Sequence, residues 1–218
     1  MQESAETEVS RLNDRGLALA GDGNIEEAIS CFDQILEIDP DNVYGWYGRG
    51  LAMKLRGDLN AAVECFDQAL TIDPEHKESW EEKGLIHREA GDLDGAILCF
   101  TYAVSIDPLF ADGWFSKGLA LQEKARETED PELFKESAEC FGCALKMDQG
   151  MTEAWYNKGV SLLLAGLPRE AVQSFDHVIE RDPVHAQAWY NKGLALEDTG
   201  DMSAAEACYN LARKLVEP

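Results

Sequence analysis

The chain has 218 residues, and its 42 acidic and 19 basic side chains give a formal net charge of -23 at pH 7. Long-range repulsion argues against nucleic acid and anionic membrane surfaces as partners and favours a basic partner. No apolar run reaches membrane-spanning length, and the start Met1-Gln2-Glu3-Ser4 lacks the basic and apolar segments of a secretion signal, so we expect a cytoplasmic protein.

Residues 1–8 are polar and acidic, and we expect them to form a disordered leader. From Val9 onward the chain repeats itself with a period of 34 residues. Six units follow one another, at 9–42, 43–76, 77–110, 111–151, 152–185 and 186–218. Because each unit of a repeat array packs mainly on its neighbours, the sequence predicts a single solenoid over 9–218.

Five landmarks recur at fixed positions of the unit. Position 8 is always glycine and position 24 is always aromatic, at Gly16, Gly50, Gly84, Gly118, Gly159, Gly193 and Phe32, Phe66, Phe100, Phe141, Phe175, Tyr209. Position 4 is Trp from the second unit onward, position 20 is Ala or Ser, and position 32 is Pro in four units. This pattern resembles the tetratricopeptide repeat family. The resemblance implies an all-α, right-handed superhelical solenoid of antiparallel helix pairs that acts in protein–protein interaction.

Each unit has the apolar spacing of two amphipathic helices, helix A over about positions 1–14 and helix B over about positions 16–30. A glycine followed by Asn or Asp, as in Gly23-Asn24 and Gly57-Asp58, marks the turn between them. The glycine at position 8 has no side chain, so we expect helices A and B to approach closely there.

The fourth unit has 41 residues, and its seven extra residues add about one turn to each of its helices, over 123–127 and 130–134. Asp130 followed by Pro131 predicts the start of its helix B. Two interpretations remain open at this point. The insertion is either a protruding knob that docks a partner through Phe134, or an extra turn that packs on itself.

In the last unit, helix B has no following helix to cover its apolar side, although repeat arrays usually need a polar cap. This suggests an alternative function, a structural protein that self-associates through the uncapped last repeat and the fourth-repeat protrusion. A homo-oligomer is therefore possible.

The resemblance places helix A on a concave groove, which by helical angle would be faced by positions 2, 5, 6, 9, 12 and 13. We predict that a basic peptide segment of a partner binds there, through Tyr47, Glu78, Glu81, Glu82, Phe115, Tyr156, Asn157, Tyr190 and Asn191. Amides pair with a peptide backbone, tyrosines add contact area, and the glutamates attract Lys or Arg. Alternatively, the Tyr-Asn pairs are repeat consensus and serve solubility and hydrogen bonds between units.

Some members of the family grip a ligand's C-terminal carboxylate with Lys at position 5 and Asn at position 9. Here position 5 has no Lys, and position 9 is Leu17, Leu51, Leu85, Leu119, Val160 and Leu194. That clamp is absent from this chain.

Position 7 is basic in every unit, at Arg15, Arg49, Lys83, Lys117, Lys158 and Lys192. A basic stripe could bind a polyanion, but its helical angle lies far from the groove centre. We expect these side chains to lie against the tryptophans and to pair with position 31 of the preceding unit, which is Asp39, Asp73, Asp107, Asp148 and Asp182.

Five of the six cysteines, Cys31, Cys65, Cys99, Cys140 and Cys208, share position 23 and are expected to be reduced packing residues. Cys143 lies outside this set and forms Cys-x-x-Cys with Cys140, a spacing that also occurs in redox pairs and zinc half-sites. The four histidines have no ligand or catalytic spacing. We expect no enzyme activity, metal or cofactor.

Overall fold

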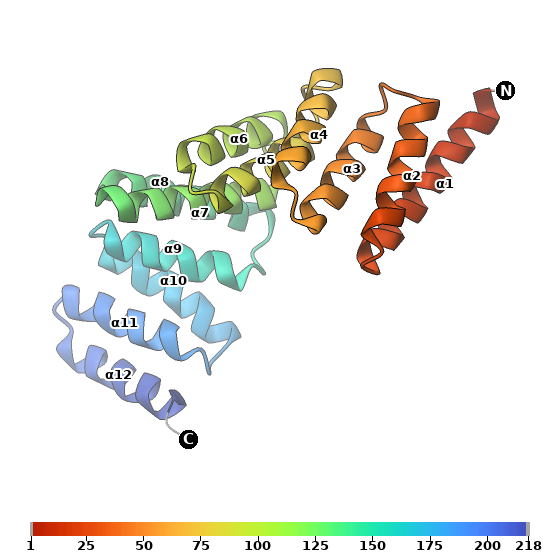
Figure 1. The fold of residues 1–218 in the computed structure, drawn as a ribbon. Helices are drawn as coiled ribbons and strands as arrows, with labels where there is room; N and C mark the ends of the chain where they lie inside the picture. Colours follow the sequence, from red (N-terminus) through yellow and green to blue (C-terminus); the bar gives the residue numbers. More distant parts are fainter. Residues whose placement is uncertain (1, 217–218) are drawn as a thin grey trace. The chain divides into compact units, whose positions relative to one another are not determined.

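The computed structural model describes the backbone of residues 2–216 and the side chains of residues 5–216. Over these residues the chain is helical, without strands, and consecutive helices form antiparallel pairs (Figure 1). The helices are α1 (Gln2–Gly21), α2 (Ile25–Ile38), α3 (Val43–Arg56), α4 (Leu59–Ile72), α5 (Lys77–Glu89), α6 (Leu93–Ile106), α7 (Ala111–Thr128), α8 (Pro131–Met147), α9 (Thr152–Leu164), α10 (Pro168–Arg181), α11 (Ala186–Asp198) and α12 (Met202–Val216). The predicted all-α array of helix pairs is confirmed.

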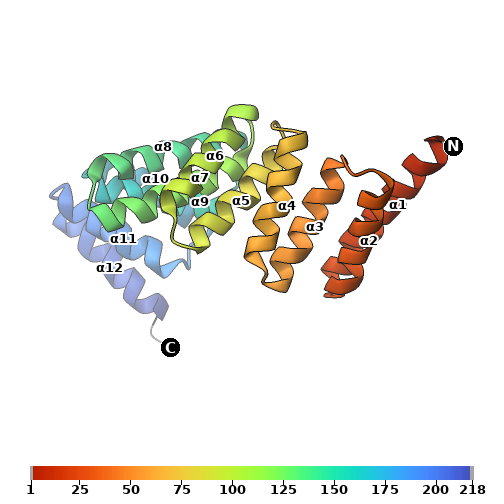
Figure 2. The same cartoon turned by 45° about the horizontal axis from the view of Figure 1, so that its top comes forward.

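The chain divides into two compact units, Met1–Asp92 and Leu93–Pro218, which are described separately as unit 1 and unit 2. Unit 1 contains α1 to α5 and unit 2 contains α6 to α12. Within each unit every helix packs against the next one along the chain, and both views display this order (Figures 1 and 2). Helix A also contacts the helix A of a neighbouring repeat, as α1 does with α3 and α9 with α11. A single solenoid over 9–218 stays a prediction.

The first helix differs from the expected leader. Helix α1 begins at Gln2, so residues 2–8 continue helix A of the first repeat instead of preceding it. Gln, Ala and Glu are good helix formers, and acidic residues favour the N-terminal end of a helix. Val9 packs against the buried cluster of unit 1, which anchors this segment to the array.

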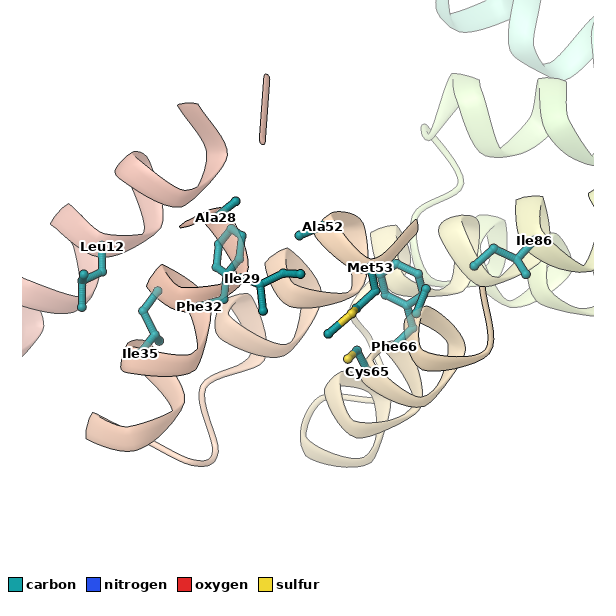
Figure 3. Packing of buried hydrophobic residues seen from close by; sticks show 11 residues of the cluster. Leu12, Ala28, Ile29, Phe32, Ile35, Ala52, Met53, Cys65, Phe66 and Ile86 are labelled. Carbon is teal, nitrogen blue, oxygen red and sulfur yellow. The ribbon is translucent and has the colours of Figure 1, made fainter. Parts of the chain in front are cut away.

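The core of unit 1 is a row of apolar side chains between the helices (Figure 3). Phe32 and Phe66 at position 24 are fully buried. A Cβ atom added at Gly16 would lie 2.7 Å from the Phe32 ring, and one added at Gly159 of unit 2 would lie 2.7 Å from the Phe175 ring. The glycine at position 8 therefore makes room for the aromatic ring of the same repeat, as the sequence predicts.

The tryptophans at position 4 fix each repeat to the loop before it. All five indole N–H groups donate to the carbonyl of the residue six positions earlier, over 2.9–3.1 Å. The acceptor is Gln149 for Trp155 and a proline for the others. Because only the carbonyl takes part, Gln149 replaces proline without loss of the contact.

The insertion of the fourth repeat lengthens both of its helices. Helix α7 has 18 residues and α8 has 17, compared with 14 for each of α3 and α4. Asp130 caps α8 by accepting the backbone N–H of Glu132 at 2.9 Å, and Pro131 is the first helical residue. Phe134 is only 6% exposed. The extra turn packs on itself, and the idea of Phe134 as an exposed anchor is wrong.

Candidate functional site

The groove face of unit 1 is hollowed between its A helices. A hollow of about 330 Å³ is lined by Leu17 of α1, by Leu51, Lys54 and Leu55 of α3, and by Glu82 of α5, among other residues. These residues occupy positions 6, 9, 12 and 13 of their repeats, which the helical angle assigns to the groove. The lining combines leucine side chains with a single pair of opposite charges.

Tyr47 lies among the three glutamates that the sequence singles out. Burial raises the pKa of the Tyr47 phenol, and the charges of Glu82, Glu78 and Glu81 raise it further. A carboxylate opposes the ionisation of a phenol only when the two groups lie near each other. Tyr47 and the three glutamates therefore share one negatively charged environment. The structure thus brings together all the predicted site residues of unit 1.

The three glutamates differ in the exposure and in the contacts of their side chains. Glu82 is 17% exposed in its side chain and forms an ion pair of 2.6 Å with Lys54, whose side chain is 29% exposed. Glu78 is 43% exposed in its side chain and lies 3.8 Å from Nε2 of His76. Glu81 is partly buried on the same helix. Glu78 therefore exposes more of its side chain than Glu82, which holds Lys54 in place.

His76 has a role that sequence reasoning missed. Its ring is buried, and Nδ1 accepts the backbone N–H of Ser79 at 3.2 Å, which caps α5. The ring also stands edge-on to Tyr47, with centroids 5.0 Å apart, and burial lowers the pKa of His76. His185 caps α11 in the same way and lies beside Tyr156. The sequence could have indicated this capping role, because both histidines occupy position 34, directly before a helix A.

The Tyr-Asn pairs of unit 2 form hydrogen bonds within the chain. Nδ2 of Asn191 donates to the Tyr156 hydroxyl at 3.0 Å and so joins α11 to α9. Nδ2 of Asn157 donates to the Glu153 carbonyl at 3.0 Å, within its own helix. The Asn191 contact is the inter-repeat hydrogen bond of the alternative interpretation, and the Asn157 bond is local.

Tyr190 and Phe115 face different surroundings. Tyr190 is 52% exposed and lies 5.5 Å from the ring of Tyr209. It lines a hollow of about 640 Å³ together with Gln187, Leu194 and Glu197 of α11 and with Tyr209 and Arg213 of α12. Phe115 instead lies 5.6 Å from the Phe141 ring and packs against the cluster around it. Of these two aromatics, Tyr190 is the more exposed, and Phe115 is partly buried.

A buried polar network links α7, α8 and α9 and was not predicted. Nε2 of Gln122, which is 2% exposed, donates to the Ser161 hydroxyl at 2.7 Å and to the Asn157 carbonyl at 3.2 Å. The Ser137 hydroxyl donates to the Gly118 carbonyl at 2.8 Å and lies 3.0 Å from the Ser161 hydroxyl. The sequence feature that could have indicated this network is Ser137, which occupies position 20, where the other repeats have alanine.

Three of the six basic residues at position 7 pair with a different acid from the one expected. Arg49 contacts Asp33 at 2.8 Å, and Lys83 and Lys192 contact Asp67 and Asp176, each at 2.5 Å. These aspartates are at position 25, on helix B of the preceding repeat. The position-31 partner is wrong because that residue lies in the loop between repeats, where Asp73, Asp107 and Asp182 accept backbone N–H groups two residues ahead.

The predicted contact with tryptophan is present. From the second repeat onward, the position-7 cation lies 5.3–5.8 Å from the centroid of the indole three residues earlier. The position-23 cysteines are buried, and burial raises the pKa of the Cys140 thiol to about 12. Such a thiol stays protonated at neutral pH, as a packing residue would.

Within residues 2–216, no helix is both long and apolar enough to cross a membrane. The side chains described in the structure contain no group of three or more His, Cys, Asp or Glu that could hold a metal ion.

Solved structures with similar folds are themselves repeat proteins. The crystal structure of YrrB, described as a TPR protein with an unusual peptide-binding site, matches with a TM-score of 0.76 at 21% identity, over 85% of this chain and 92% of YrrB. PilF of Pseudomonas aeruginosa matches with a TM-score of 0.76 at 17% identity, over 98% of this chain and 94% of PilF. MamA matches with a TM-score of 0.67 at 20% identity, over 76% of this chain and 93% of MamA. At these identities the likeness concerns the fold alone.

A search of curated proteins finds no match to the chain. The model of the tetratricopeptide repeat family matches residues 13–76, 55–109 and 156–217, which leaves out the whole of the lengthened fourth repeat. These regions cover well over half of the 218 residues, so the chain belongs to the tetratricopeptide repeat family.

Proposed function

We propose that the chain is a protein–protein interaction scaffold that binds a basic peptide segment of its partner on the groove face of unit 1. The observation that carries this proposal is the position of Tyr47 among Glu78, Glu81 and Glu82, beside a hollow lined by leucines. A protein with a net charge of -23 also attracts basic partners at long range.

The binding mode follows from the chemistry of the groove. The aliphatic stem of a ligand Lys or Arg would lie against the Tyr47 ring, and its charged end would reach Glu78 and Glu81. Apolar side chains of the same segment would enter the hollow beside Leu51 and Leu55. A short segment held in this way is expected to bind with a dissociation constant on the order of micromolar.

Two further observations support a peptide ligand. YrrB, which shares the fold, is described as having a peptide-binding site. In unit 2, Tyr190 lines a second hollow on the groove face of α11, and the Tyr156–Asn191 hydrogen bond holds the neighbouring helix in register. We propose that this surface, with Asn157 next to it, contacts a further part of the partner, and that Phe115 contributes by packing. The cytoplasm is the proposed location, since a reducing compartment suits six free cysteines.

Peptide binding tests the proposal directly. Labelled peptides of equal length, rich in Lys and Leu, in Ser and Leu, or in Glu and Leu, are titrated with the protein and followed by fluorescence anisotropy. The basic peptide is expected to bind and the Ser peptide is not, and Glu78→Gln with Glu81→Gln should weaken the basic peptide by about tenfold or more.

The matched control removes two carboxylates elsewhere, through Glu37→Gln and Glu64→Gln on α2 and α4, and makes the net charge less negative by the same amount. If both double variants lose the same affinity, the attraction comes from overall charge and the groove is not the site. If the basic peptide does not bind the wild-type protein, the proposal fails.

Self-association is a second candidate, and the exposed apolar side chains of α12 favour it. Leu211, Leu215 and Val216 are all exposed there. If this face pairs with a second copy, sedimentation velocity at rising concentration will reveal a dimer that Leu211→Glu and Leu215→Glu abolish. A monomer mass at all concentrations would exclude this candidate.

A further inference from the structure

The series of ion pairs at position 7 is interrupted at Lys117, which follows Thr101 at position 25, and at Lys158. In the second, third and sixth repeats, the position-7 cation binds an aspartate of the preceding repeat at 2.5–2.8 Å. In front of Lys158 the equivalent residue is Gly142, which has no side chain. A Cβ atom at Gly142 would lie 3.7 Å from Nζ of Lys158, so the two residues still face each other. Within the described residues, Lys158 has no carboxylate partner.

The space left by the missing aspartate is open. A hollow of about 500 Å³ lies between α8, α9 and the start of α10, and Gly142, Cys143, Leu162 and Leu167 contribute to its lining. An aspartate side chain fills the equivalent place in three other repeats, whereas here the place is accessible from outside. The residues that line it are different from those that line the proposed groove of unit 1.

The charges that face this hollow are mainly positive, in contrast to the protein as a whole. Lys135, Lys146 and Lys158 line it, and Glu139 is the one acidic residue in its lining among the described side chains. Lys135 forms an exposed ion pair with Glu132 at 2.6 Å, while Lys146 and Lys158 have no such partner among the described residues. Burial and the neighbouring Lys146 both lower the pKa of Lys158. An anion in the hollow would relieve both effects.

We infer that this hollow is a second binding site, which takes an Asp or Glu side chain from an acidic segment of a partner protein in place of the aspartate that the chain itself lacks at Gly142. The carboxylate would contact Nζ of Lys158 as Asp67 contacts Lys83. Lys146 would add attraction, and Leu162 and Leu167 would receive an apolar neighbour of the acidic residue. This site would act independently of the basic-peptide groove.

In three other repeats, the group that pairs with the position-7 cation is a carboxylate. Each occupied copy of the site holds one carboxylate against one cation that lies over a tryptophan ring. Lys158 keeps the same ring contact, 5.3 Å above Trp155. Its amine is therefore already positioned, and a ligand need supply only the acid.

The test restores the missing aspartate in the chain. A labelled six-residue peptide that alternates Asp and Leu, and its counterpart with Asn for Asp, are titrated with the protein by fluorescence anisotropy in about 150 mM salt, where charges separated by more than about 8 Å are screened. The acidic peptide is expected to bind and its Asn counterpart is not. Gly142→Asp should weaken the acidic peptide by about tenfold or more, because an internal carboxylate then occupies Lys158.

Two variants control for shape and for charge. Gly142→Asn fills the same space without a charge and should weaken binding less than Gly142→Asp. Thr101→Asp adds an aspartate at position 25 in front of Lys117 and should leave binding unchanged. Equal binding by wild type and Gly142→Asp would overturn the inference, as would equal losses in all three variants.

A second measurement follows Lys158 itself. Its pKa, read from the ¹³Cε resonance assigned with Lys158→Met, should rise when the acidic peptide is added and should be raised in Gly142→Asp without peptide. If the acidic peptide leaves this pKa unchanged, the peptide binds elsewhere and the inference fails. If millimolar inorganic phosphate raises the pKa but the peptide does not, the site takes a different class of anion and the inference is again overturned.

Discussion

The amide of Asn191 donates a hydrogen bond of 3.0 Å to the hydroxyl of Tyr156 and thereby ties α11 to α9. These two residues occupy positions 6 and 5 of adjacent repeats. The contact means that two predicted ligand-binding residues also hold neighbouring repeats together. A substitution at either one therefore changes stability as well as the groove surface.

The first prediction concerns this pair. Asn191→Ala and Tyr156→Phe should each lower the free energy of unfolding by about 1 kcal/mol, with little further loss when combined, because both remove the same hydrogen bond. Asn157→Ala is the matched control, since its amide bonds only to its own helix and should cost less. Urea unfolding followed by circular dichroism compares the wild type with all four variants. Fully additive losses would mean that the two side chains do not interact.

The second prediction concerns pH. The pKa of His76 is lowered mainly by burial, which outweighs the opposite influence of Glu78 and Asp73. The folded state therefore prefers the neutral ring, whose Nδ1 accepts the N–H of Ser79. Stability from this cap is complete above the unfolded-state pKa of about 6.5 and declines as the pH falls below it, through the lower folded-state pKa.

His76→Asn should remove this part of the pH dependence, because Asn42 already caps α3 at the equivalent position and does not titrate. Denaturation at about pH 7.5 and about pH 5 should give a larger loss of stability for the wild type than for the variant. The cap itself is worth about 1 kcal/mol, which sets the expected size of the difference. Parallel losses in both proteins would assign the pH dependence to other groups.

The sequence was sufficient for the repeat architecture because the same steric demand recurs in each unit. Gly159 is required by the Phe175 ring, and the equivalent pairs repeat along the chain. The long helices of the fourth repeat were predictable for a similar reason, since Asp130 and Pro131 form a strong start signal. Residues 2–8 were misjudged because polar composition does not exclude a helix that continues from a packed one.

The candidate site was less predictable, because helical angle gives the face of a residue but not its partners. Tyr47 and its glutamates do lie together, but Tyr47 also packs on the Phe66 ring, as Phe115 packs on the Phe141 ring. The acid that pairs with Lys83 was misassigned, since position 31 and position 25 are both close in sequence to the next helix A. Only the three-dimensional arrangement separates a loop aspartate from one on helix B.

The third prediction tests the steric role of position 8. Gly159→Ala should lower the free energy of unfolding by about 1–3 kcal/mol, because the added methyl group would lie 2.7 Å from the Phe175 ring. Gly21→Ala is the control, since nothing lies within 4 Å of its Cβ position, and it should be neutral or slightly stabilising. Thermal and urea unfolding compare the two. Equal stability of both variants would show that the helix pair adjusts without cost.

The fourth prediction compares two lysines that share position 7. Lys192 pairs with Asp176 at 2.5 Å, so Lys192→Met should lose up to about 1 kcal/mol of stability. Lys158 has no carboxylate before it, and burial and Lys146 lower its pKa, so its charge opposes folding at neutral pH. Lys158→Met should therefore keep or slightly raise the stability, since the apolar side chain still packs on Trp155. Urea unfolding of both variants decides the matter. If Lys158→Met loses as much stability as Lys192→Met, the Lys158 amine has a stabilising partner within the chain. The open place at Gly142 would then no longer support an acidic ligand from another protein.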